Sequence, residues 1–322
     1  MKQNAIKVAA VKDLKITKVK TESHEEWLKL RSQYIGGSDA AAVIGLNQFS
    51  SPYALWAEKT GKVPSFEGNL ATEVGTYLED FVAKKFAEET GKKVRKANMS
   101  FFNIDYPWAI ANIDREVIGE DAGLEIKTTS ELNLKRFKGG DYPANYYAQM
   151  THYLAVTGKQ RWYLAVLIGN REFKTFTLER DEAEIAALMK AESEFWELVK
   201  NNTPPPVDGS HATTEAIKTI YPESGSSEAD LFLHRTDIDR YMALSEQIKE
   251  LEGLRDEAAN RVKAYLGESG RGECDKYRVS WTSAVRRSFD SKRFAEDHKD
   301  IDLSAYYKET SARTFRVSVK KG

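Results

Sequence analysis

The chain has 322 residues, of which 41% are hydrophobic and 30% charged, and its formal net charge is −1. These values suit one large or two modest globular domains, with no apolar run long enough for a membrane span or a signal region. The single cysteine, Cys274, excludes a disulfide framework and a four-cysteine iron–sulfur site and suits a reducing cytoplasm. Because the net charge is near zero, any contact with DNA has to be focal.

Changes in composition along the chain predict four segments. A basic leader covers residues 1–24, and an α/β core covers residues 25–202 and ends in a helix. The breaker Asn201–Pro206 then opens a linker at residues 203–234. Residues 235–322 are predicted to form a C-terminal domain with a long helix followed by short strands.

The first motif lies at Arg31–Ile44, where Gly36 and Gly37 precede Ser38 and a run of alanines. Ser38 or Asp39 is a good N-cap for a helix, and the two glycines would let a ligand approach the backbone. Free amides, a hydroxyl and an arginine can together bind phosphate. The structural alternative is an ordinary Gly-Gly turn before a capped helix.

A helix is predicted over Asn69–Gly91, with Gly91 as its C-cap. Glu79 lies beside the apolar stripe, so it points either into a site or to solvent. The stripe consists of Val74, Leu78, Phe81, Val82 and Phe86.

The most informative stretch is residues 108–130, which predicts two strands joined by a polar turn at Gly119–Gly123. Alternation places Glu125 and Lys127 on one face of the second strand. With Asp114 on the preceding strand, two carboxylates and a lysine suit Mg²⁺-dependent phosphodiester hydrolysis, because Mg²⁺ prefers oxygen ligands. The alternative is the solvated face of an edge strand, since the same spacing recurs at Asp13–Lys15, Glu172–Lys174 and Asp290–Lys292.

Two further elements follow this stretch. A basic, glycine-rich loop at Leu134–Gly140 offers Arg136 and Lys138 to DNA. An amphipathic helix is predicted over Asn145–Val156, in which Gln149 is either a satisfied core amide or a contact to phosphate or metal-bound water. Next, Arg161–Ile168 and Arg171–Leu178 predict a hairpin across Gly169–Asn170.

The C-terminal third carries no motif that indicates a function. Residues 209–228 are predicted to be irregular, and residues 237–266 to form one long helix with apolar residues at nearly heptad spacing. That helix suits a coiled coil, a helical hairpin or packing on its own domain. A short helix is predicted at Ser288–His298, and strands at Lys276–Trp281 and Thr314–Lys320.

Across about residues 31–176, five motifs in this order resemble the YqaJ-like viral recombinases, a family that includes phage lambda exonuclease and belongs to the PD-(D/E)XK nuclease superfamily. The resemblance implies an α/β (α+β) core with a central mixed sheet flanked by helices, plus a C-terminal helical/β extension. It assigns metal binding to Asp114, Glu125, the Ile126 carbonyl and Glu79, and positioning of the attacking water to Lys127. It also assigns the scissile region to Gln149 and the 5′-phosphate to Arg31 and Ser38. From their residue types, Gly37 and the basic loop residues Arg136 and Lys138 are further candidates to bind the 5′-phosphate or DNA.

The function implied is a 5′-to-3′ exonuclease on linear double-stranded DNA that leaves 3′ single-strand tails for recombination. Mg²⁺ is the expected cofactor, with two ions per site and Mn²⁺ as an acceptable substitute. The expected partners are DNA ends, a single-strand annealing protein (RecT-like) and further copies of the chain in a trimeric ring, in a phage- or prophage-carrying bacterial cytoplasm. The alternatives are a sequence-specific endonuclease of the same fold and a non-catalytic DNA-binding scaffold.

One residue departs from the family pattern. The family often has glycine directly after the first aspartate, whereas this chain has Arg115. We therefore expect Arg115 to lie near the substrate or on the turn, with a local geometry of its own.

Overall fold

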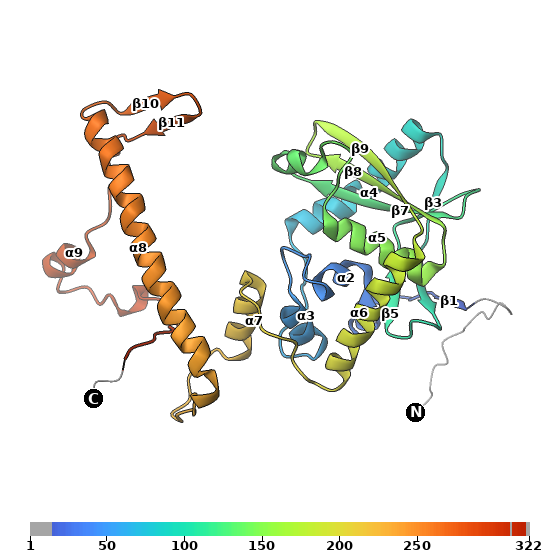
Figure 1. The fold of residues 1–322 in the computed structure, drawn as a ribbon, viewed down its shortest axis with the longest axis horizontal. Coiled ribbons are helices and arrows are strands. Elements are labelled where there is room, and N and C mark those ends of the chain that lie inside the picture. Colours follow the sequence, from blue (N-terminus) through green and yellow to red (C-terminus); the bar gives the residue numbers. More distant parts are fainter. Residues whose placement is uncertain (1–14, 310, 320–322) are drawn as a thin grey trace. The chain divides into compact units, whose positions relative to one another are not determined.

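The computed structural model describes residues 15–309 and 311–319, and the chain separates into two units, Met1–Tyr221 and Pro222–Gly322 (Figure 1). Residues 1–14, which include most of the predicted basic leader, lie outside the described residues. The division between the units falls within residues 203–234. Among the described residues, no helix is both long and apolar enough to cross a membrane.

The main sheet of the first unit has the strand order β3-β6-β7-β8-β9. Its strands are β3 (Val94–Lys96), β6 (Arg115–Val117), β7 (Ala122–Thr129), β8 (Arg161–Ile168) and β9 (Glu172–Glu179). β7 and β8 are parallel and the other pairs antiparallel. The predicted hairpin is therefore confirmed as β8 and β9, and the sheet is mixed, as predicted.

A second sheet has the order β1-β4-β5-β2, with β1 (Ile16–Val19), β2 (Ile35–Gly36), β4 (Ser100–Asn103) and β5 (Ala109–Asn112). Between β5 and β6 the chain leaves this sheet and enters the main one. Asp114 lies at that passage, immediately before β6. Its backbone position is therefore set by both sheets.

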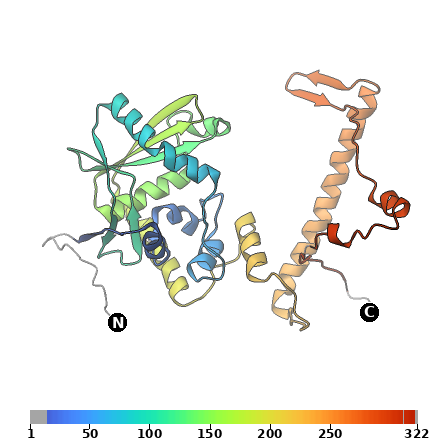
Figure 2. The same ribbon diagram turned by 180° about the vertical axis from the view of Figure 1, so that it is seen from behind.

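Two helices cover opposite faces of the main sheet (Figures 1 and 2). α4 (Leu70–Thr90) packs on the face that carries Leu124 and Ile126. α5 (Ala144–Thr157) connects β7 to β8 and packs on the other face. The alternation predicted for the second strand is thus confirmed, because its apolar residues meet α4 while Glu125 and Lys127 belong to the opposite face.

Two of the predicted helices, α4 and α5, differ from expectation in how much of their surface is buried. α4 ends at Gly91 as predicted, with a left-handed backbone (φ 71°), but only the second half of its stripe is buried, since Val74 and Phe81 are 42% and 54% exposed. α5 is not amphipathic along its last ten residues, all of which are buried. Its outer side is covered by α2 (Gly37–Val43) and α6 (Glu182–Lys200).

A buried ion pair joins α5 to α6. His152 Nδ1 lies 2.8 Å from Glu192 Oε1, and His152 Nε2 lies 3.0 Å from the Ile110 carbonyl oxygen. Both side chains are fully buried. Burial would lower the pKa of His152, but the charge and hydrogen bond of Glu192 outweigh it, so the pKa of His152 is raised.

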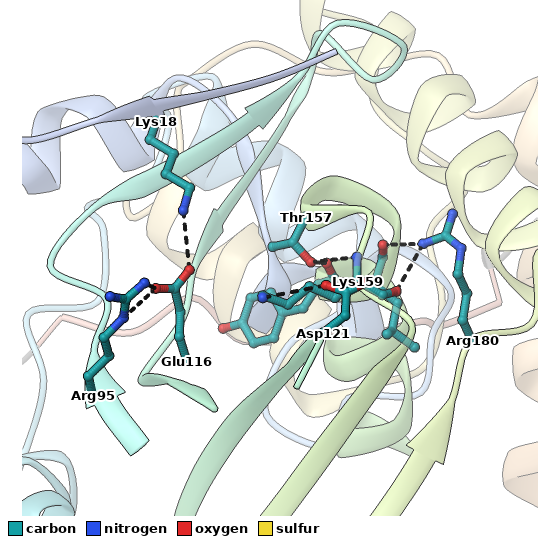
Figure 3. Close-up of polar contacts among 9 residues, drawn as sticks. Lys18, Arg95, Glu116, Asp121, Thr157, Lys159 and Arg180 are labelled. Atoms are coloured by element: carbon teal, nitrogen blue, oxygen red, sulfur yellow. Dashed lines mark hydrogen bonds and ion pairs between the residues drawn. The ribbon is translucent and has the colours of Figure 1, made fainter. Parts of the chain in front are cut away.

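Polar contacts also fix the ends of the elements around the sheet. Figure 3 shows Glu116 accepting hydrogen bonds from Lys18 and Arg95. Because neighbouring strand residues point to opposite faces, Glu116 points away from its neighbour Arg115. In the same view Arg180 donates to the carbonyls of Leu154 and Lys159, which satisfies acceptors at the C-terminal end of α5.

The rest of the first unit consists of α1 (His24–Ser32), α3 (Pro52–Lys59), the 3₁₀ turn η1 (Glu131–Phe137) and α7 (His211–Ile220). α7 corrects the prediction that residues 209–228 are irregular. Ser210 caps this helix, and Thr213 forms a buried 2.7 Å hydrogen bond with Ser51 at the start of α3. The cap, this hydrogen bond and the packing of Ala216, Ile217 and Ile220 against the core beside α3 together order a stretch with weak helix propensity.

The second unit contains η2 (Phe232–His234), α8 (Arg235–Leu266), β10 (Arg271–Cys274), β11 (Tyr277–Ser280), α9 (Ser291–Asp297) and η3 (Ser304–Tyr306). The long helix, the short helix and one strand are confirmed. The strand predicted at Thr314–Lys320 is wrong in its described part, which has no regular structure. β11 pairs with the adjacent β10, and a hairpin between neighbouring segments costs little loop-closure entropy.

Candidate catalytic site

Asp114 is tied directly to strand β7. Its Oδ2 accepts a 2.7 Å hydrogen bond from the Ile126 backbone N–H. The last residue pair between β6 and β7 is Arg115 with Leu124, so Ile126 lies beyond the ladder. Because the N–H and C=O of one strand residue point to the same side, the Ile126 carbonyl also faces Asp114. The predicted carbonyl ligand is therefore directed to the predicted carboxylate ligand.

Glu125 and Lys127 lie side by side on the face covered by α5. Lys127 Nζ lies 2.6 Å from Glu125 Oε1, and their side chains are 24% and 3% exposed. The Lys127 ammonium also lies 5.5 Å from the centre of the Tyr146 ring, a distance at which the ring face attracts a cation. This burial excludes the alternative that Glu125 belongs to a solvated strand face.

The electrostatics of this group favour a bound cation. Burial raises the pKa of Asp114 well above its usual range, and the charge of Glu125 raises it further. Burial also raises the pKa of Glu125, which Lys127 offsets only in part. Burial would lower the pKa of Lys127, but the charges of Glu125 and Asp114 outweigh it and raise that pKa. Lys127 is therefore a cation at neutral pH. The raised pKa values of Asp114 and Glu125 show that holding both carboxylates ionised here is costly, and a bound cation would offset that cost.

An unpaired carboxylate oxygen also favours a bound cation at this site. Glu125 Oε2 is buried and has no hydrogen-bond partner, which is costly unless another group binds there. Asp114, Glu125 and the Ile126 carbonyl supply the hard oxygen ligands that Mg²⁺ prefers, so the residues present fit this ion. Within residues 15–309 and 311–319, however, no three His, Cys, Asp or Glu side chains converge as a ligand set.

Glu79 is the predicted ligand that stands apart. It reaches the site from α4, but its Oε1 is bound by the Arg115 guanidinium. The same guanidinium binds Asp80 Oδ1 at 2.6 Å and donates to the Asp114 carbonyl at 2.8 Å. Arg115 is therefore neither on a turn nor exposed: its side chain is 4% exposed and lies between α4 and Asp114.

Gln149 is a satisfied buried amide, the first of its two predicted roles. Its Nε2 donates to Glu125 Oε1 at 2.7 Å and to the Tyr153 hydroxyl at 2.8 Å. Burial raises the pKa of Tyr153 well above its usual range, and the charges of Glu125 and Asp114 add to the effect. Tyr153 therefore stays neutral, and through Gln149 it holds Glu125 in place.

The predicted phosphate residues also meet. Arg31 donates a 2.6 Å hydrogen bond to Ser38 Oγ. The helix start differs from prediction, because Gly36 is the N-cap of α2 and Asp39 accepts from its backbone N–H at 3.0 Å. Burial would raise the pKa of Asp39, but the charges of Lys59 and Arg31 lower it. Asp39 therefore stays ionised and holds Arg31 near Ser38.

The structure gives Gly37 a role in packing. A Cβ atom at Gly37 would lie 2.4 Å from the Tyr153 ring, and one at Gly123 would lie 2.4 Å from the Trp162 ring. The two rings pack on each other with centroids 5.1 Å apart. Both glycines therefore make room for this aromatic pair, which joins α2 to the sheet.

The two basic residues of the loop lie at the edge of the site. Arg136, in η1, is exposed. Burial raises the pKa of Tyr146, the ring beside Lys127, and the charge of Arg136 offsets part of that rise. The Arg136 guanidinium lies 3.4 Å from Gln48 Oε1. Lys138 is exposed at the C-terminal end of η1. Neither contacts the carboxylate pair in the described contacts, so both suit a rim rather than the centre.

Sequence reasoning missed two residues that hold the site together. Lys59 is almost fully buried, and its Nζ lies 2.8 Å from Asp39 Oδ2. Nothing in its surroundings along the chain distinguishes it from other helical lysines. Tyr153 lies one helical turn after Gln149, so the i, i+4 spacing of two groups that can hydrogen-bond to each other was an available signal.

A mixed sheet between two helical layers, with one carboxylate just before a strand and a second carboxylate and a lysine on the next strand, is the arrangement of the PD-(D/E)XK fold class. Residues 26–160 match the family described as the YqaJ-like viral recombinase domain. The chain is also 38% identical over 301 residues to the uncharacterized protein YqaJ of Bacillus subtilis (strain 168), covering 92% of this chain and 94% of that protein. The chain therefore belongs to the YqaJ-like viral recombinase family.

Similar solved structures cover little more than half of the chain. An alkaline exonuclease (LHK-Exo) from Laribacter hongkongensis is 23% identical with a TM-score of 0.45, over 56% of this chain and 94% of that one. A phage related exonuclease from Haemophilus somnus 129PT is 14% identical with a TM-score of 0.42, over 55% of this chain and 99% of that one. The match to the Bacillus subtilis protein, by contrast, extends over both units.

Proposed function

We propose that the chain is a Mg²⁺-dependent exonuclease that degrades the 5′-ended strand of linear duplex DNA and leaves a 3′ single-strand tail. The observation that carries this proposal is the pair of partly buried Asp114 and buried Glu125, with an unpaired carboxylate oxygen on Glu125, beside the Lys127 cation. Membership of a viral recombinase family supports DNA ends as the substrate. The tail would serve a single-strand annealing protein, and the working form would be a homotrimeric ring.

The residues divide the work of hydrolysis between them. Asp114, Glu125 and the Ile126 carbonyl would hold Mg²⁺, with a second ion or Mn²⁺ also admissible, and the ion would supply positive charge to the scissile phosphate and lower the pKa of bound water. Lys127, a cation held at 2.6 Å from Glu125, donates hydrogen bonds to the attacking water and to the charge that develops on the phosphate. Gln149 and Tyr153 keep Glu125 from turning away.

The direct test uses linear duplex DNA labelled separately at its 5′ and 3′ ends, with a closed circular duplex as control. We expect early release of the 5′ label from linear DNA only, and no release when a chelator removes divalent metal. Cutting of the circle would replace the proposal with an endonuclease. No cleavage with Mg²⁺ or Mn²⁺ would leave a DNA-binding scaffold.

We propose that the 5′ end of the strand binds at Arg31 and Ser38, where the Arg31 guanidinium nitrogen lies 2.6 Å from Ser38 Oγ. Together the two residues present a cation and a hydroxyl to a 5′-phosphate. Arg31→Ala should lower the rate on 5′-phosphorylated ends by about 10- to 100-fold, because a charge-assisted contact is lost, and should change the rate on 5′-hydroxyl ends much less. The measurement is the ratio of initial rates on the two kinds of end.

Lys29→Ala is the matched control for this prediction. It removes one exposed positive charge from the same helix, α1, and should leave the ratio unchanged. A wild-type enzyme that cuts phosphorylated and hydroxyl ends equally fast would refute the phosphate pocket.

A further inference from the structure

Arg115 occupies the position where the family pattern often has glycine, and its contacts are directed at the catalytic group. Its guanidinium bridges two consecutive carboxylates of α4, Glu79 and Asp80, and donates to the carbonyl of Asp114. The side chain is 4% exposed, compared with 29% for Glu79 and 72% for Asp80. The burial of the guanidinium leaves it few partners other than these.

This arrangement decides which carboxylates are available to a cation. Glu125 has an oxygen with no partner, whereas Glu79 already shares its oxygen with Arg115. A guanidinium bound to a carboxylate both neutralises its charge and fixes its direction. Asp114 and Glu125 are therefore open to a cation, while Glu79, although close enough to act on the pKa of both, is engaged elsewhere.

We infer that Arg115 is a positioning residue that holds Glu79 out of the metal site in the DNA-free protein. The cation would be bound by Asp114, Glu125 and the Ile126 carbonyl without Glu79. The Arg115 clamp, defined as Arg115 with Glu79, Asp80 and the Asp114 carbonyl, keeps Glu79 from adding to the affinity. This inference rests on the proposed metal site and extends it to a residue outside the family pattern.

The test is calorimetric titration of the full-length, DNA-free protein with Mn²⁺. Arg115→Met removes the charge and keeps much of the side-chain volume, which frees Glu79. We expect Mn²⁺ to bind at least about tenfold more tightly than to the wild type, because a close positive charge is removed and a carboxylate is gained. In the double variant Arg115→Met/Glu79→Gln this gain should disappear. That requirement for Glu79 separates the clamp from a merely structural role.

Arg95→Met is the matched control, because Arg95 pairs with Glu116 on the same sheet but outside the site, and it should leave Mn²⁺ affinity unchanged. If Arg115→Met does not fold, Arg115→Gln keeps an N–H for the Asp114 carbonyl and answers the same question. Unchanged or weaker Mn²⁺ binding in a folded Arg115 variant, or a gain that survives Glu79→Gln, would overturn the inference.

The same titration separates this inference from the proposed function. Asp114→Asn should lose Mn²⁺ binding if the metal site is correct. Wild-type binding in Asp114→Asn would remove the metal site and the clamp together. Loss of Mn²⁺ binding in Asp114→Asn without tighter Mn²⁺ binding in Arg115→Met would refute the clamp but leave the metal site standing.

Discussion

Replacement of Lys127 by alanine should reduce the rate of DNA cleavage by about 10²- to 10⁴-fold while the chain stays folded. Lys127 is the cation that lies against Glu125, and the carboxylates around it keep it charged at neutral pH. Alanine removes both the hydrogen-bond donor for the attacking water and the charge that faces the phosphate. The measurement is the initial rate of 5′-label release, with circular dichroism as the check on folding.

The chain supplies its own control for this variant. Lys174 on β9 follows Glu172 at the same Glu-x-Lys spacing and forms an ion pair with it at 3.3 Å, but no carboxylate equivalent to Asp114 lies beside it in the described contacts. Lys174→Ala should therefore keep nearly full activity. Normal turnover in Lys127→Ala would remove the catalytic assignment, since no other described cation contacts Glu125.

The largest expected loss of stability comes from Glu192→Ala. The variant leaves His152 fully buried without its partner, and breaking a buried ion pair on one side costs about 3–5 kcal/mol. Urea unfolding should show this change in the free energy of unfolding. Glu197→Ala, on the exposed side of the same helix, where Glu197 is 58% exposed, should change it by less than about 0.5 kcal/mol. Equal midpoints for the two variants would contradict the prediction.

The same pair predicts a dependence of stability on pH. The Ile110 carbonyl can only accept, so His152 Nε2 carries a hydrogen, and a second proton on Nδ1 makes the ring a cation facing Glu192. Because the folded-state pKa of His152 is raised, the stabilisation is fully present below about pH 6.5, the usual value in the unfolded chain. It is lost as pH rises through the folded-state pKa, at up to about 1.4 kcal/mol per pH unit.

Glu192→Gln isolates this dependence. The amide has the same shape and can donate to Nδ1 of a neutral imidazole, so this variant should recover most of the stability that alanine loses. Its free energy of unfolding should fall less steeply than that of the wild type above pH 6.5. Parallel slopes in the two proteins would show that His152 does not bind the extra proton.

The sequence predicted the parts of the site that depend on local periodicity. Alternation on one strand correctly placed Glu125 and Lys127 together, and the hairpin turn at Gly169–Asn170 correctly joined β8 to β9. It did not predict the ends of α2, because Gly36 rather than Ser38 or Asp39 begins that helix. There, a tertiary ion pair to Lys59 decides the role of Asp39, and tertiary partners cannot be inferred from spacing.

The remaining differences share a physical cause. Burial of α5 on all sides depends on α2 and α6, which come from segments far away in the chain. The clamp of Arg115 on Glu79 links residues that are 36 positions apart. The structure of the second unit, in which no described side chain is buried, was the hardest to predict. Apolar periodicity reflects which residues face a core, and these residues face none. The strand predicted at Thr314–Lys320 in this unit was wrong in its described part.

The aromatic pair between Gly37 and Gly123 has a consequence for the products of the proposed reaction. Tyr153 lies against Gly37, next to Ser38, and its hydroxyl is bound through Gln149 to Glu125. One buried ring therefore fixes the separation between the proposed end-holding residues and the cleaving residues. If the chain is the proposed exonuclease that holds a strand by its end, the position of Tyr153 would set the distance from the bound end to the cleaved bond, and with it the number of nucleotides removed at each step.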